Sequence, residues 1–74
     1  MNNKRRDEIG KIRVLLDEAN SLTSELRSEE EDYRDNMPES FEEKREAADN
    51  AIDAFESAEA ALEEALGYLE TAAE

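Results

Sequence analysis

Apolar residues recur along this chain at alternating steps of three and four positions. The pattern is clearest in the second half, where two columns have members seven residues apart: Ala48, Phe55, Leu62 and Leu69, and Ala51, Ala58, Ala65 and Ala72. A stripe with this period stays on one side of a helix only when helices wind gently around each other. The repeat therefore predicts helices that pack along one another.

The first half carries a matching stripe. Its members follow the same alternating steps: Ile9, Ile12, Leu16, Ala19, Thr23, Leu26, Glu30, Tyr33 and Met37. Leu15 and Leu22 widen this stripe on one flank. A sequence of high charge and low hydrophobicity can also be disordered, but a disordered chain has no reason to keep its large apolar residues at helical spacing.

One break separates the two stripes, at Met37 and Pro38. Proline lacks an amide hydrogen and disfavours the helical conformation in the residue before it, so the first helix must stop by about Asn36. Asn36 can end it in the left-handed conformation. Pro38 suits a first helical turn, and Ser40 with Glu43 forms a capping-box pattern. These signals predict helices over about residues 3–35 and 38–73, with a turn at about 36–38.

A connection this short forces the two helices to run antiparallel. The predicted fold is all-α: one domain, residues 1–74, forming an antiparallel two-helix hairpin. Folding about the turn sets four pairs face to face: Tyr33 with Phe41, Leu26 with Ala48, Ala19 with Phe55, and Ile12 with Leu62. It also brings the basic residues 4–6 beside Glu70 and Glu74, at the negative end of the second helix.

One seam between two helices cannot bury every apolar position. The surplus on the first helix includes Leu15 and Leu22, and on the second helix it includes Ala51, Ala58 and Ala65. A second hairpin covering these residues predicts a homodimer, a four-helix bundle. Two glutamates fall on core positions of the stripes. Glu30 is expected at a solvated rim and Glu59 there or paired with Lys11 or Arg13, unless either sets the register or contacts a partner.

Composition narrows the chemistry. The chain has 74 residues, a net charge of −13 and neither cysteine nor histidine. Disulfides, thiolate or imidazole metal sites and histidine-assisted nucleophiles are therefore excluded. No apolar run approaches the roughly 20 residues that span a bilayer, and anionic headgroups repel so acidic a chain. We expect a cytoplasmic protein that does not bind membranes.

The acidic residues are densest around the break, and we name this cluster the acidic tip: Glu29, Glu30, Glu31, Asp32, Asp35, Glu39, Glu42 and Glu43. A calcium loop from Asp32 to Glu43 fails, because Arg34 takes a ligand position and Met37 takes the place of the turn glycine. A di-iron bundle needs Glu-x-x-His ligands, and this chain has no histidine. Acid–base catalysis needs a desolvated pocket, which a rod of two helices is not expected to form. The sequence thus predicts no catalytic residue, no metal site and no cofactor.

Direct binding of nucleic acid requires a basic face, and only the start of the chain is basic. An acidic protein can instead imitate nucleic acid, because its carboxylates can occupy the binding groove of a basic, nucleic-acid-binding partner. The competing interpretation is that these acids only keep an alanine-rich coiled coil soluble. Both interpretations stay open on composition alone.

Residues 25–74 carry a resemblance. It rests on the stretch 29–40, on Ala-x-x-Ala-Ile-Asp-Ala-x-Glu from Ala48, and on residues 61–65; Asp-Asn-Met-Pro-Glu-Ser is the most specific part. The chain resembles short acidic helical-hairpin proteins of unassigned activity from phages and prophages of Gram-positive bacteria. The resemblance implies a bacterial host cell and an inhibitor of host defence, of anti-CRISPR or anti-restriction type. We therefore expect a non-enzymatic inhibitor of a nucleic-acid-handling protein; the alternative is an assembly adaptor that acts through coiled-coil packing.

Overall fold

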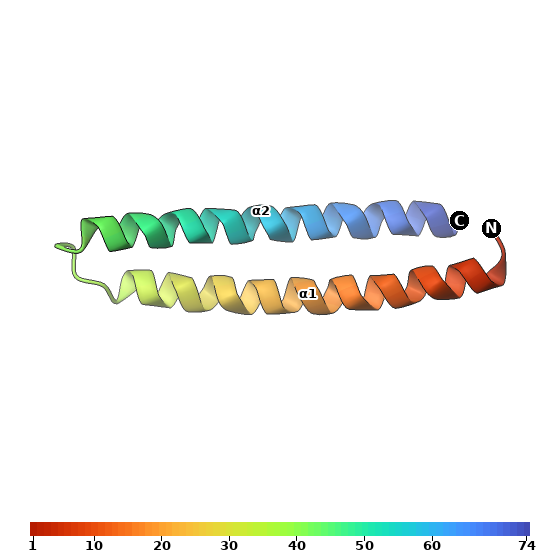
Figure 1. The fold of residues 1–74 in the computed structure, drawn as a ribbon, viewed down its shortest axis with the longest axis horizontal. Helices are drawn as coiled ribbons and strands as arrows, with labels where there is room; N and C mark the ends of the chain where they lie inside the picture. Colours follow the sequence, from red (N-terminus) through yellow and green to blue (C-terminus); the bar gives the residue numbers. More distant parts are fainter.

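The chain folds into two long helices joined by one short connection. The computed structural model describes residues 1–74 and contains α1 (Asn3–Asp35) and α2 (Glu42–Ala73). The helices lie side by side and antiparallel, with both chain termini at the end opposite the connection (Figure 1). The Cα positions span 59 Å along the longest axis and 14 Å and 11 Å across, and the side chains widen the rod beyond this. The predicted all-α helical hairpin is confirmed.

Local hydrogen bonds set the ends of α1. Asn2 caps its start, because its side-chain Oδ1 accepts a hydrogen bond of 2.9 Å from the Arg5 amide. At the other end the Asn36 amide donates to the Asp32 carbonyl at 3.0 Å. Asn36 itself has φ −87° and ψ −3°, and no residue of the chain has a positive φ. The predicted left-handed ending is therefore wrong, and α1 ends in right-handed geometry at Asp35, three residues before Pro38.

The connection covers residues 36–41, so α2 begins later than the predicted start at about residue 38. The Phe41 amide donates to the Pro38 carbonyl at 3.0 Å, which closes a turn outside the helix. Ser40 lies within this turn, and the predicted capping box with Glu43 is wrong because no side chain caps α2. Glu42 and Glu43 instead occupy its first turn, where negative charge is favourable.

Helix α2 turns the predicted stripe toward α1. Ile52, Phe55, Leu62, Leu66 and Leu69 are all half-buried along this seam. Ala48 is the one fully buried residue of the chain, at 2% exposure. Two helices alone cover only one side of each stripe, so the hairpin buries far less apolar surface than a layered domain of similar length.

Helix α1 is rotated relative to the prediction. The inward column Ile9, Leu16, Thr23 and Glu30 is as expected, but the second column is Arg13, Asn20, Arg27 and Arg34, each one residue later than predicted. Ile12, Leu26 and Tyr33 are 45–54% exposed, so the predicted pairings of these side chains with α2 do not hold the hairpin together. The cause is electrostatic, because the arginines of the second column reach carboxylates on α2.

Candidate interaction surfaces

Polar side chains seven residues apart follow the border between the helices; we call them the arginine column, and they are Arg6, Arg13, Asn20, Arg27 and Arg34. All four arginines contact α2. Arg6 Nε donates to the Ala73 carbonyl at 2.9 Å, which places a cation at the negative end of α2. Arg13 Nη2 lies 3.0 Å from Glu70 Oε1, and Arg34 Nε lies 2.8 Å from Asp49 Oδ1. The expectation that residues 4–6 lie beside the end of α2 is confirmed for Arg6, which also donates to the Glu74 carbonyl, whereas Glu70 pairs with Arg13.

Glu59 is the carboxylate that the column encloses most completely. Arg27 Nε donates to its Oε1, and Ser24 Oγ donates to its Oε2 at 3.0 Å. The Arg27 hydrogen bond holds the pKa of Glu59 below its ordinary value; desolvation opposes this shift, and the Ser24 hydrogen bond adds to it. Hydrogen bonds to Glu59 and Glu31 raise the pKa of Arg27 in turn. The predicted partners of Glu59, Lys11 and Arg13, are therefore wrong.

Asn20 interrupts the arginine column. Its side-chain Oδ1 is buried and has no hydrogen-bond partner. An unsatisfied acceptor of this kind lowers stability, and an apolar residue of similar shape would avoid the loss. Asn20 is thus the one position of the column that makes no polar contact through its side-chain oxygen.

The sequence does contain a signal for this seam. Arg6, Arg13, Arg27 and Arg34 keep a seven-residue spacing as strict as that of the alanine columns. Apolar spacing alone does not reveal this seam, because the wide apolar stripe of α1 allows more than one rotation of the helix. Charge periodicity would have fixed the rotation.

The rotation of α1 leaves an apolar surface uncovered. On α1 a second stripe follows alternating steps of three and four through Ile12, Leu15, Ala19, Leu22 and Leu26, and Tyr33 resumes it after Glu29, which occupies the intervening position. On α2 a second stripe does the same: Ala47, Ala51, Ala54, Ala58, Ala61, Ala65 and Tyr68. Leu15, Leu22 and Tyr68 are 60–68% exposed. Ala58 is exposed as well, whereas Ala51 and Ala65 are half-buried at the edge of the seam.

Both second stripes lie on the same side of the hairpin. Successive residues of a helix are rotated by about 100° around its axis. On each helix the second stripe is therefore rotated by roughly 100° from the side that faces the other helix. The rotation has the same sense on both helices when each is viewed from its own N-terminus. The helices run in opposite directions, so these equal turns point to one side. We call this side the apolar face; the carboxylates of the arginine-column ion pairs, Asp49 and Glu70, border the opposite side.

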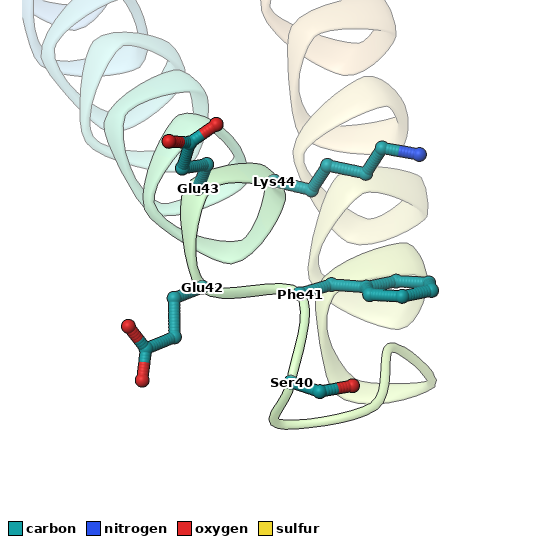
Figure 2. A pocket seen from close by; sticks show the side chains of 5 residues that line it. All are labelled: Ser40, Phe41, Glu42, Glu43 and Lys44. Atoms are coloured by element: carbon teal, nitrogen blue, oxygen red, sulfur yellow. The ribbon is translucent and has the colours of Figure 1, made fainter.

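The acidic tip is partly neutralised by its neighbours. Glu31 pairs with Arg27 at 2.9 Å, and Asp35 lies 3.4 Å from Arg34. Glu30 is half-buried, and the remaining tip carboxylates are exposed: Glu29, Asp32, Glu39, Glu42 and Glu43. Figure 2 shows Glu42 and Glu43 pointing to one side of the turn, while Phe41 and Lys44 point to the other. Lys44 Nζ lies 5.4 Å from the centroid of the Phe41 ring.

The concave features of the molecule are shallow. One hollow is lined by residues 40–44 at the turn, and the other is lined by Val14, Asp17, Glu18, Ser21 and Leu22 along α1. No group of three or more carboxylates is placed to hold a metal ion. Neither helix combines the length and the apolar character needed to cross a membrane.

Comparison with protein-family models, with curated proteins and with solved structures found no match to this chain.

Proposed function

We propose that this chain is a non-catalytic interaction protein that acts by packing its apolar face against helices of a protein partner. One observation carries the proposal: the hairpin fully buries a single alanine while Leu15, Leu22, Leu26 and Tyr33 remain at least half exposed on one side. Burying a large apolar side chain contributes on the order of 1.5–3 kcal/mol. A contiguous apolar surface of this kind typically marks a protein-binding site.

The spacing of the face supports a helical partner. Its residues recur at three and four positions, which is the pattern that packs into the grooves of another helix. The alanines of α2 permit close approach, while the leucines of α1 supply volume. Helix-in-groove recognition uses anchors at this spacing.

The acidic tip supports a second candidate function, inhibition of a nucleic-acid-handling protein in a bacterial host cell by an anti-CRISPR or anti-restriction type of mimicry. Six tip carboxylates are exposed, and none of the tip residues takes part in an ion pair between the helices. Their field would attract a basic groove. The resemblance to acidic phage proteins favours the same function.

One experiment distinguishes the two candidates: capture of a partner from an extract of the native host by the immobilised full chain, at low and at high salt. The face variant is Leu15→Glu. The tip variant combines Asp32→Asn, Glu39→Gln and Glu43→Gln, and it leaves Glu29 unchanged because that residue shares a helix column with Leu15 and Leu22. If the apolar face is the working surface, capture survives high salt and the tip variant, and Leu15→Glu abolishes it.

The opposite pattern, with salt-sensitive capture that competes with DNA and is lost in the tip variant, would replace the first proposal by the second. Val14→Glu serves as the matched control for Leu15→Glu. Val14 directly precedes Leu15 in the sequence and is 57% exposed. It belongs to neither stripe of the apolar face.

A further inference from the structure

We infer that the occupant of the apolar face is a second copy of this chain, packed face to face with its acidic tip beside the chain termini of the first. The inference rests on the proposed function, because it names the partner of the same face. Three observations carry it: the size of the face, the distribution of charge along the rod, and the position of Lys11.

The face has the dimensions of a dimer interface. Each of its two stripes spans 22 residues, from 12 to 33 and from 47 to 68, which is about 33 Å at 1.5 Å per residue. Two helices of about 10 Å diameter give a width of about 20 Å. Pairing two such faces would bury on the order of 1,300 Å² in total, which is within the range of stable, specific interfaces.

A two-fold axis can bring the same face of two hairpins together in two ways. If the connections lie at the same end, α1 of each copy packs on α2 of the other. If they lie at opposite ends, α1 packs on α1 and α2 packs on α2. In the second arrangement the leucines meet leucines, the alanines meet alanines, and the axis passes close to Leu22 and Ala58, which lie midway along their stripes.

Charge selects the second arrangement. Residues 29–45, at the tip, carry eight acidic and three basic side chains, a net charge of −5. Residues 1–13 and 62–74, at the other end of the rod, together carry six acidic and five basic side chains, a net charge of −1. Placing two tips side by side would oppose two charges of −5, whereas the opposite order sets each tip beside the nearly neutral end of its partner.

Lys11 gives this arrangement a specific contact. It borders the α1 stripe on the side away from α2, and it has no ion pair within its own chain. With the axis near Leu22, Lys11 lies at the level of residue 33 of the other copy. Lys11 therefore comes alongside the partner's Asp32. A lysine that is unpaired within its own hairpin thus gains a carboxylate of the other copy's acidic tip.

The first test is the oligomeric state of the full chain, measured by sedimentation from about 1 to 100 µM. We expect a dimer of the 8.4 kDa chain. Leu22→Glu should weaken the dimer at least about tenfold, since it buries a charge without a partner. Val14→Glu adds the same charge outside the face and should leave the dimer unchanged. A folded monomer of the unmodified chain at 100 µM would overturn the inference.

The second test fixes the order of the copies and does not depend on a destabilised variant. The chain has no cysteine, so single cysteines report proximity cleanly. Under mild oxidation Leu22→Cys and Ala58→Cys should form disulfide-linked dimers. Ser40→Cys at the tip and Ala60→Cys on the opposite side should not. Linkage through Ser40→Cys in place of the other two would show tips at the same end and overturn the inference.

The two proposals fail in different ways. If the chain is a folded monomer but Leu15→Glu still abolishes capture of a host protein, the apolar face works on a different helical partner and only the self-pairing is wrong. If the chain is a dimer through this face and capture is unaffected by Leu15→Glu, the self-pairing stands and the face is not the docking surface for other proteins.

Discussion

At the scale of single residues, Glu59 is the most informative position. It occupies a core position of the α2 stripe, between Phe55 and Leu62, where an unpaired carboxylate would be costly. Arg27 and Ser24 together satisfy both of its oxygens. A half-buried ion pair with this geometry specifies how α1 is rotated, because only the observed rotation brings Arg27 to Glu59.

The pH dependence of stability follows from this pair. The folded-state pKa of Glu59 lies below its ordinary value of 4.5, so its contribution is fully present above that pH and is lost as the pH falls through the folded pKa. Glu59→Gln removes the contribution. In thermal unfolding followed by circular dichroism, the unmodified chain should melt above Glu59→Gln at pH 7, and the difference should shrink below about pH 4.5.

Glu56→Gln is the matched control, since Glu56 is exposed and makes no ion pair. Its melting temperature should stay close to that of the unmodified chain at pH 7. A Glu59→Gln difference that remains constant down to pH 3 would show that the ionised pair contributes nothing.

At the scale of the helices, α2 was far more predictable than α1. Apart from Tyr68, the large apolar residues of α2 are confined to one column pair, so its buried side is evident from Phe55, Leu62 and Leu69. The apolar stripe of α1 is wider, and apolar spacing alone could not separate the side facing α2 from the side facing away. The start of α2 was missed because Pro38 and Ser40 fit a first helical turn and a tight turn equally well.

Ala48 is the most completely buried residue of the seam between α1 and α2. Ala48→Leu adds three carbons where the exposure is already 2%, so the helices must separate or the side chain must take a strained rotamer. We expect the free energy of unfolding, measured by urea denaturation, to fall by about 1–3 kcal/mol. Ala60→Leu, an exposed alanine on the same helix, should change it by less than about 0.5 kcal/mol. A more stable Ala48→Leu would mean that this part of the seam is loosely packed.

At the scale of the whole molecule, repulsion among like charges opposes the fold. A net charge of −13 is held on a rod whose Cα positions span only 14 Å by 11 Å in cross-section, and only three ion pairs join the two helices. Repulsion between unpaired carboxylates therefore outweighs the attraction of the pairs. Because of this excess of negative charge, the relative orientation of two hairpins in a dimer depends on where along the rod the charge is concentrated.

Salt should stabilise this protein. The Debye length falls from roughly 10 Å at 0.1 M to roughly 3 Å at 1 M, which is shorter than the width of the rod. Screening removes more repulsion than attraction, so the melting temperature should rise steadily as sodium chloride is added over this range. A fall in melting temperature would show that the inter-helix ion pairs dominate the electrostatics. Glucose at matched osmolality controls for effects that do not depend on charge.

The two chain ends lie together at one end of the rod, and this determines how the hairpin responds to force (Figure 1). A pull applied through both ends would open the seam like a zipper, loading the Arg6 contacts first and the Arg13–Glu70 pair next, one turn at a time. A pull between the connection and the two ends would instead stretch both helices along their axes, so their backbone hydrogen bonds would carry the load and the seam would not be opened. The hairpin is therefore mechanically weak when it is stretched between its two termini, and it is stiff when the force acts along its length.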